Sequence, residues 1–202
     1  MKPIQSLGSS YGKIAIKTRL ATNSWEGICS GGVSDKFTGS QNCMNKLKNI
    51  VKNSTSESFI LHVGGNDAYS RTPGIISPDN ILGQVIDFYK QMFELITQQQ
   101  KELFIIGYLP RYFIGQQKSS SWAKLKSEDR KIKRLVKRWK LDYFQTTGVY
   151  AKVAYLDIGF AFDNFELYTP KDEVHLNERG HKKYKEIVSG RIQLNRISKF
   201  KV

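Results

Sequence analysis

The sequence predicts one α/β domain in which a parallel β-sheet is covered by helices on both faces. Short apolar segments alternate five times with segments of helical periodicity, a pattern typical of successive β-α units. The central segment, 59–63, is apolar almost throughout, as expected for a strand that is buried on both faces. The 202 residues are enough for one such domain and too few to favour two.

Glycine-containing turns follow most of the expected strands. These strands cover residues 2–7, 25–29, 59–63, 103–106 and 153–157. Glycine adopts backbone conformations that other residues avoid, so it marks points where a strand ends and the chain turns sharply. Because ligands bind beyond the carboxyl ends of the strands in open parallel sheets, a functional site is expected at these turns.

Apolar residues at helical spacing indicate helices between the strands and at the end of the chain. The expected helices cover residues 13–20, about 40–51, 77–96, 128–144 and the residues from 181 onward. The third begins with Ser77-Pro78, an N-cap followed by proline at the first helical position. Gly148 is expected to end the fourth. The segment 111–121, together with Trp122, fits either a lid over a pocket or a packed loop.

The chain carries a large positive charge. Its formal net charge is +14 and its pI is about 9.7. Basic residues surround the helix expected over 128–144 and recur from Lys182 onward. They form either a solvated surface or a binding face, so nucleic acid and anionic surfaces are candidate partners, although no aromatic cluster typical of RNA-binding modules accompanies them. We divide the chain into a domain over 1–190 and a basic C-terminal tail over 191–202.

The N-terminal residues do not have the pattern of a targeting segment. Met1–Leu7 lacks the apolar core of a signal peptide, and no apolar run approaches the roughly 18 residues of a membrane-spanning helix. We therefore expect a soluble protein, with a cytoplasmic or nuclear location favoured, although the chain could be a fragment of a longer protein. Cys29 and Cys43 fit neither a disulfide framework nor a metal site, so reduced thiols are expected.

Asp172 and His175 are separated by two residues in the segment that follows the last expected strand. A carboxylate that accepts a hydrogen bond from one imidazole nitrogen fixes the tautomer and supports the positive charge formed when the other nitrogen takes a proton. Such a pair is the base half of a serine hydrolase. The hydroxyl is expected from Ser10, at the first strand-to-helix turn, with Ser9 as the neighbouring alternative.

Acyl transfer also needs donors for the negative charge that develops on the carbonyl oxygen. Three candidates are expected at the same sheet edge, namely the backbone amides of Ser10 and Gly31 and the side chain of Asn66. Each has a simpler interpretation, because serine beside glycine is usually a turn residue and asparagine after two glycines usually bonds to local backbone. Structural roles are expected for His62 and His181.

Four sequence blocks resemble those of the SGNH hydrolases, also called the GDSL esterases and lipases. The blocks are Gly8-Ser9-Ser10-Tyr11, Cys29-Ser30-Gly31-Gly32, Gly64-Gly65-Asn66-Asp67 and Asp172-Glu173-Val174-His175. The last two match the family's Gly-x-Asn-Asp and Asp-x-x-His patterns fully, whereas Ser9 stands where the family usually has aspartate. The resemblance spans residues 4–188. The Gly-Ser-Ser form is also similar to esterase-like domains carried by mobile elements in animal genomes.

This resemblance implies a flavodoxin-like three-layer α/β/α sandwich with a five-stranded parallel sheet, without a metal or organic cofactor. It implies that Ser10 is the nucleophile, His175 the base and Asp172 the residue that orients the base. It also implies an oxyanion hole formed by Ser10, Gly31 and Asn66.

The expected function is a serine esterase that hydrolyses a carboxylic ester with a short acyl group, such as acetyl, through an acyl-enzyme. The alternative is a module of the same fold in which Ser9, standing in for the family's aspartate, leaves catalysis weak or absent. Such a module would bind nucleic acid or an anionic surface through its basic face.

Overall fold

The described part of the chain forms a sheet of four parallel strands. The structure, a computed structural model, describes residues 4–8, 12–21, 40–69, 79–112 and 121–198. The strands β1 (Ile4–Gly8), β2 (Ser58–His62), β3 (Glu102–Ile106) and β4 (Val153–Leu156) pair in the order β1-β2-β3-β4. The parallel sheet is confirmed, and within the described residues it has four strands, where five were predicted. The expected strand over 25–29 lies outside the described residues, as do Cys29 and the side chain of Cys43.

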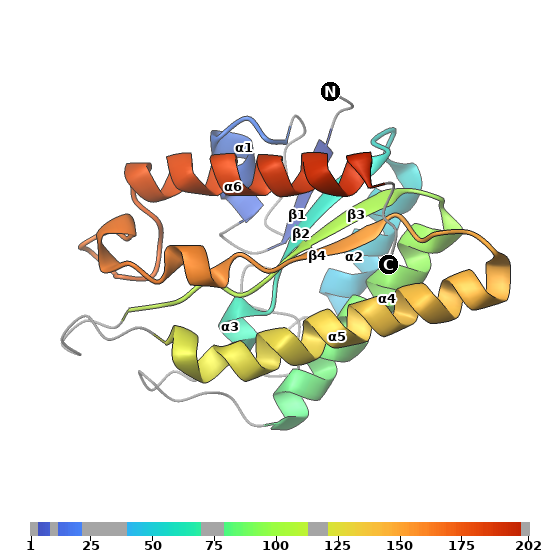
Figure 1. The fold of residues 1–202 in the computed structure, drawn as a ribbon, viewed down its shortest axis with the longest axis horizontal. Coiled ribbons are helices and arrows are strands. Elements are labelled where there is room, and N and C mark those ends of the chain that lie inside the picture. Colours follow the sequence, from blue (N-terminus) through green and yellow to red (C-terminus); the bar gives the residue numbers. More distant parts are fainter. Residues whose placement is uncertain (1–3, 9–11, 22–39, 70–78, 113–120, 199–202) are drawn as a thin grey trace.

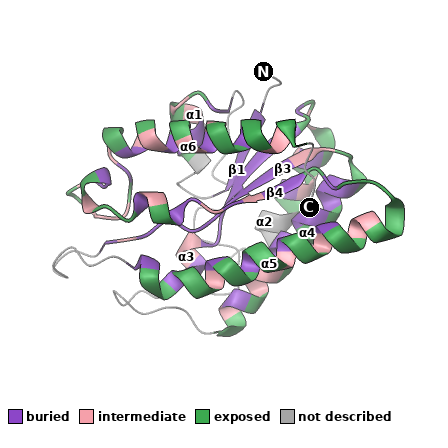
Figure 2. Cartoon of the chain, viewed as in Figure 1, coloured by how far each residue is buried: buried purple, intermediate pink, exposed green. Residues whose placement is uncertain are grey.

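Helices cover both faces of the sheet, so the fold has three layers (Figure 1). The helices α2 (Ser40–Asn53), α4 (Asp79–Gln98) and α5 (Trp122–Thr147) pack on one face, and α1 (Gly12–Lys17) and α6 (Glu178–Ile197) pack on the other. Alternate strand residues enter the two cores, as Leu61 and Ile60 of β2 show. The strands are therefore buried on both sides (Figure 2), and the predicted α/β/α sandwich is confirmed.

The helices α4 and α5 use their apolar stripes to cover the sheet. In α4 most of the predicted stripe is buried, namely Leu82, Val85, Tyr89, Met92, Phe93 and Ile96. Helix α5 begins at Trp122 rather than at the predicted Glu128. Trp122 is buried against Gly159, where an added Cβ would lie 2.3 Å from the indole ring, so Trp122 belongs to the core and not to a lid. Gly148 ends α5 as predicted, with a φ of +70° and its N–H donating to the Phe144 carbonyl at 2.8 Å.

A buried carboxyl group attaches α5 to the sheet. Asp129 accepts hydrogen bonds from the Tyr108 amide at 2.9 Å, just beyond β3, and from the Tyr155 hydroxyl at 2.7 Å, in β4. Burial raises the pKa of Asp129 to about 6, although both hydrogen bonds act in the opposite direction. The contact fixes the loop that leaves β3, and the sequence does not predict it.

The helix α6 continues to Ile197, so most of the residues assigned to a basic tail extend this helix. Arg196 pairs with Glu102 at 2.8 Å and donates to the Ser58 hydroxyl at 2.9 Å, which fixes the end of α6 to the amino ends of β2 and β3. Ile192 is buried, whereas Leu194 and Ile197 are exposed. Among the helices described, none combines the length and apolar character needed to span a bilayer.

Candidate active site

The strands β1 and β2 end side by side at the carboxyl edge of the sheet. Gly8, the last residue of β1, pairs with His62, the last residue of β2. Gly8 has a φ of +136°, and a Cβ on it would lie 2.2 Å from the His62 carbonyl oxygen, so only glycine fits. The segment that carries Ser10 therefore starts at this edge. Ser10 and Gly31 themselves lie outside the described residues, so their predicted roles stay predictions.

Asn66 lies directly beyond β2, in the short helix α3 (Gly65–Ala68). The preceding Gly64 has a φ of +86°, and a Cβ on it would lie 3.0 Å from the Tyr108 ring and 3.1 Å from Val85. This tight turn keeps α3 against the end of the strand. The structure thus places Asn66 at the predicted edge, and its role as an oxyanion donor stays a prediction.

Arg111 fixes the orientation of the Asn66 amide. Its Nη2 donates to Asn66 Oδ1 at 2.6 Å, and its guanidinium carbon lies 4.5 Å from the centre of the Tyr69 ring. Because a guanidinium group has only donors, the amide atom that faces it must be the oxygen. The Asn66 Nδ2 group is therefore the side of the amide that does not face Arg111.

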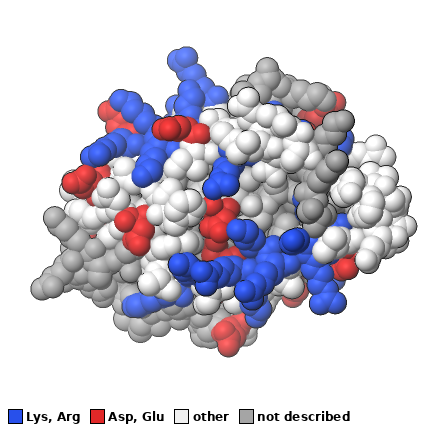
Figure 3. Space-filling model, viewed as in Figure 1, with Lys and Arg blue, Asp and Glu red and all other residues white. Residues whose placement is uncertain are grey.

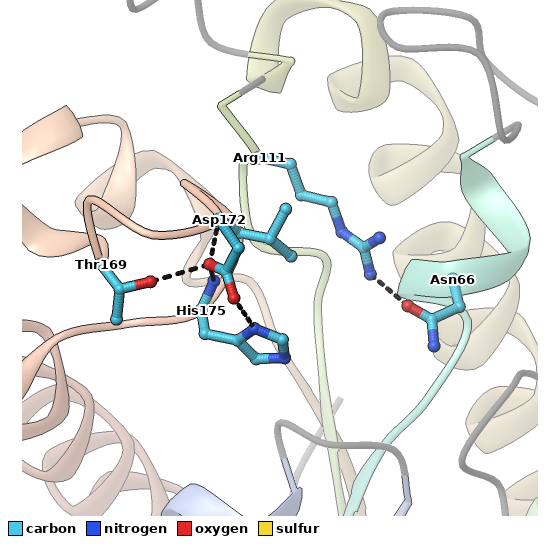
Figure 4. Close-up of polar contacts among 6 residues, drawn as sticks. Asn66, Arg111, Thr169, Asp172 and His175 are labelled. Carbon is cyan, nitrogen blue, oxygen red and sulfur yellow. Dashed lines mark hydrogen bonds and ion pairs between the residues drawn. The ribbon is translucent and has the colours of Figure 1, made fainter. Parts of the chain in front are cut away.

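Asp172 and His175 form the predicted pair (Figure 4). The His175 Nδ1 atom lies 2.6 Å from Asp172 Oδ2. The other carboxylate oxygen, Oδ1, accepts from the Thr169 hydroxyl at 2.8 Å, the Val174 amide at 3.0 Å and the His175 amide at 2.9 Å. One oxygen of Asp172 therefore builds the turn and the other holds the imidazole, which then exchanges protons through Nε2.

The pKa of Asp172 is well below its usual value. Partial burial opposes ionisation, but hydrogen bonds from the His175 amide and ring, the Val174 amide and the Thr169 hydroxyl outweigh it. Asp172 is therefore a carboxylate at neutral and mildly acidic pH, and it can stabilise a protonated His175.

A backbone hydrogen bond joins this turn to the loop after β3. The Tyr112 amide donates to the Glu173 carbonyl at 2.9 Å. The bond places Arg111 beside the pair formed by Asp172 and His175, and Figure 4 shows the guanidinium between this pair and the residues that follow β2. Segments after β2, after β3 and before α6 therefore meet at one edge of the sheet.

The other two histidines are less exposed than His175, since His62 is buried and His181 is partly buried. The His62 Nδ1 atom lies 3.3 Å from the Tyr184 hydroxyl, and the two rings stack. Burial, and secondly the nearby Arg111, lowers the pKa of His62 to about 3, so its ring is neutral. His181 lies in the first turn of α6, where burial lowers its pKa.

Sequence reasoning misses two residues of this site, Arg111 and Thr169. Arg111 lies in the loop that follows β3, but in a chain with 32 lysines and arginines its identity carries no signal. Thr169 lies three residues before Asp172, a spacing at which a hydroxyl reaches a carboxylate, so a local signal was present.

The chemistry of these groups is compatible with the predicted acyl transfer. An imidazole oriented by an ionised carboxylate can take a proton from a hydroxyl, and an oriented amide can stabilise an oxyanion. The described residues contain no group of three or more His, Cys, Asp or Glu side chains that could hold a metal ion.

Comparison with known proteins shows similarity in structure rather than in sequence. No protein-family model and no curated protein matches the chain. An acetyl xylan esterase has a TM-score of 0.55 at 14% identity, with 95% of this chain and 100% of that chain covered. A GDSL-like lipase from Bacteroides thetaiotaomicron has a TM-score of 0.52 at 14% identity, with 95% and 88% covered. A family 3 carbohydrate esterase from Clostridium thermocellum has a TM-score of 0.51 at 16% identity, with 78% and 66% covered.

The likeness extends over nearly the whole chain in the first two of these structures. The lipase is named as GDSL-like, which is the family that the sequence blocks resemble. The narrower resemblance to esterase-like domains of mobile elements stays a prediction. The three-layer architecture and these similarities together show that the chain has the fold of the SGNH hydrolases.

Proposed function

We propose that the protein is a serine esterase in which Ser10 is the nucleophile and His175 is the base. The observation that carries this proposal is the 2.6 Å contact between Asp172 and His175. An imidazole oriented by an ionised carboxylate is the base that a serine hydroxyl needs. Gly8 supports the choice of Ser10, because it holds the start of that segment beside the end of β2.

In the proposed reaction, His175 Nε2 takes the proton of Ser10 Oγ while this oxygen attacks the ester carbonyl carbon. The bond to the alcohol oxygen then breaks, the alcohol leaves with that proton, and an acyl group remains on Ser10. Water attacks the acyl carbon, giving a proton to His175, and Ser10 recovers the proton as the carboxylic acid leaves. The amides of Ser10 and Gly31 and the Asn66 Nδ2 group bind the oxyanion in both steps.

Arg111 acts in this proposal as a positioning residue. It holds the Asn66 oxygen at 2.6 Å, so the amide nitrogen is the atom that meets the carbonyl oxygen of the substrate. A donor that is already oriented needs no reorganisation when charge develops, which is why loss of one such donor slows related reactions by about 100- to 1,000-fold.

For the substrate we infer a short acyl group, such as acetyl, on a carbohydrate or another small alcohol. The sequence has no extended apolar run that would mark a channel for a long acyl chain, and one of the similar structures is an acetyl xylan esterase. The net charge of +14 favours anionic substrates through long-range attraction. Each of the three compared structures carries the name of an enzyme, so none favours the alternative of a module without catalysis.

Fluorophosphonate labelling tests the proposal, with Ser9→Ala as the matched control for Ser10→Ala. The wild type and Ser9→Ala should be labelled and should hydrolyse a short-chain aryl ester, whereas Ser10→Ala should do neither. Labelling of Ser10→Ala would show that another residue is the nucleophile. Folded wild-type protein that is neither labelled nor active would exclude the esterase and leave the binding module.

A further inference from the structure

A groove lined by cations lies between α5 and α6, along β4. Its volume is about 480 Å³. The strand β4, which is the last strand of the described sheet, contributes Ala154 and Tyr155, and α6 contributes Asn195. Figure 3 shows lysine and arginine side chains gathered over α5. The cations of the groove all come from this helix, namely Arg130, Lys133, Arg134, Lys137 and Lys140.

The five cations form a row that runs along the axis of α5. Each of them has another member of the set three or four residues away, so all five lie along one side of α5. From residue 130 to residue 140 the helix rises about 15 Å, at 1.5 Å per residue. A row of this length can contact several successive phosphates of an extended polyanion.

Little of this positive charge is neutralised within the protein. Lys133 pairs with Asp157 at 3.0 Å, and none of the other four cations forms an ion pair with a residue that the structure describes. Lys140 is 8% exposed, and burial, followed by the nearby Lys137, lowers its pKa. A largely desolvated ammonium group beside another cation opposes folding, and an anion in the groove would offset that effect.

We propose that this groove binds the phosphate backbone of single-stranded nucleic acid. Because the groove is concave, an extended strand can lie in it, whereas a flat bilayer surface cannot reach its floor. Tyr155 is partly buried and also lines the groove, and its hydroxyl is held by Asp129 at 2.7 Å. A fixed aromatic ring beside a row of cations is the combination with which proteins bind single strands. None of the residues proposed for the esterase lines this groove, so the two proposals are independent.

Fluorescence anisotropy with a labelled oligothymidylate of about 12 nucleotides tests the proposal at several salt concentrations. The groove variant is Arg130→Gln, Arg134→Gln and Lys137→Gln in the full chain. The control variant removes the same charge from α2, with Lys46→Gln, Lys48→Gln and Lys52→Gln. The groove variant should raise Kd at least about tenfold and lower the slope of log K against log salt by about 2, at about 0.7 for each phosphate that is no longer neutralised. The control should stay within about twofold of wild type.

A second variant, Lys140→Met, separates binding from folding. Methionine fills the volume of the lysine stem without its charge, so Tm should stay the same or rise while affinity for the oligonucleotide falls. A purely structural Lys140 would not give this opposite change. The Ser10→Ala variant should bind like the wild type, because the groove does not use the esterase residues.

Three results would overturn the proposal. One is an equal loss of binding in the α2 variant, because net charge alone would then explain the affinity. Another is unchanged affinity in Lys140→Met or in the groove variant. The last is binding to vesicles containing phosphatidylserine without binding to the oligonucleotide, because the basic face would then be a membrane surface.

Discussion

The two carboxylate oxygen atoms of Asp172 organise the turn that carries His175. Oδ1 accepts from Thr169 and from two backbone amides, while Oδ2 holds the imidazole of His175. The same residue therefore decides where His175 lies and which of its nitrogens carries the proton. Because the pKa of Asp172 is lowered, its carboxylate is already negatively charged before His175 takes up a proton. Asp172 can therefore stabilise the protonated imidazole without first losing a proton itself.

Replacing Asp172→Asn tests this role. The amide can still accept at Oδ1 and preserve the turn, but its nitrogen would face the imidazole and favour the wrong tautomer. We expect fluorophosphonate labelling to slow by about 1,000- to 10,000-fold. Glu173→Gln is the control, because Glu173 acts through its backbone carbonyl and should label at the wild-type rate. Equal rates for the two variants would remove Asp172 from the mechanism.

Arg111 is tested through its partner rather than alone. If Arg111 acts by orienting the Asn66 amide, Arg111→Gln should lower kcat for a short-chain aryl ester by about tenfold or more, with little change in KM. The double variant with Asn66→Ala should be no slower than Asn66→Ala by itself, because the oriented group is already gone. Effects that multiply would show that Arg111 acts on the substrate directly.

At the scale of elements, the site depends on how abruptly the strands end. Gly8 and Gly64 end the segments of β1 and β2 with positive φ angles. A Cβ does not fit at Gly8, and one at Gly64 would be in tight contact with Tyr108 and Val85. These turns keep the segments after both strands at one edge, where the loops from β3 and from the end of η2 (Phe165–Leu167) also arrive.

Alanine at Gly64 should be strongly unfavourable. A φ of +86° and contacts of 3.0 Å and 3.1 Å oppose a methyl group there, so we expect the free energy of unfolding to fall by about 1 to 3 kcal/mol. Gly83→Ala in α4 is the matched control. Nothing lies within 4 Å of a Cβ at that position, and alanine should stabilise the helix by about 1 kcal/mol. Urea unfolding measures both, and a similar loss at the two positions would contradict this account.

What the sequence predicts depends on how local each signal is. The strand β2 and the helix α4 are predictable because burial and helical periodicity appear in adjacent residues. Asp172 and His175 are predictable as a pair because they are three positions apart. Arg111 and Asn66 are 45 positions apart and meet only after the sheet has formed, so no local pattern marks them. Trp122 is misplaced because a polar stretch follows it, and only packing shows that the helix already begins there.

At the scale of the whole molecule, two buried groups give stability opposite dependences on pH. His62 has a pKa of about 3 when folded and 6.5 when unfolded, so the unfolded chain binds more protons between these values. Stability from this group therefore falls as pH decreases below 6.5, by up to about 1.4 kcal/mol per pH unit. Asp129 has a pKa of about 6 when folded and 3.8 when unfolded, so its contribution falls as pH rises through that range.

Replacing each group separately should show its own contribution to the pH dependence of stability. Between pH 6.5 and pH 5, the stability advantage of wild type over His62→Gln should shrink by about 1.5 kcal/mol, because only the wild type carries the unfavourable protonation. For Asp129→Asn the change should have the opposite sign, with the variant gaining on wild type as pH rises. Urea unfolding at the two pH values measures both, and differences that do not vary with pH would contradict the assignments.

The hydrogen bond between the Tyr112 amide and the Glu173 carbonyl has a consequence for how this protein can evolve. It is made entirely by main-chain atoms, so among single substitutions at these two positions only proline at Tyr112 would remove its donor. Other substitutions at these positions keep both the amide nitrogen and the carbonyl oxygen, so the hydrogen bond between the two loops is retained. Side chains around His175 can therefore change while the main-chain link between the two loops is kept.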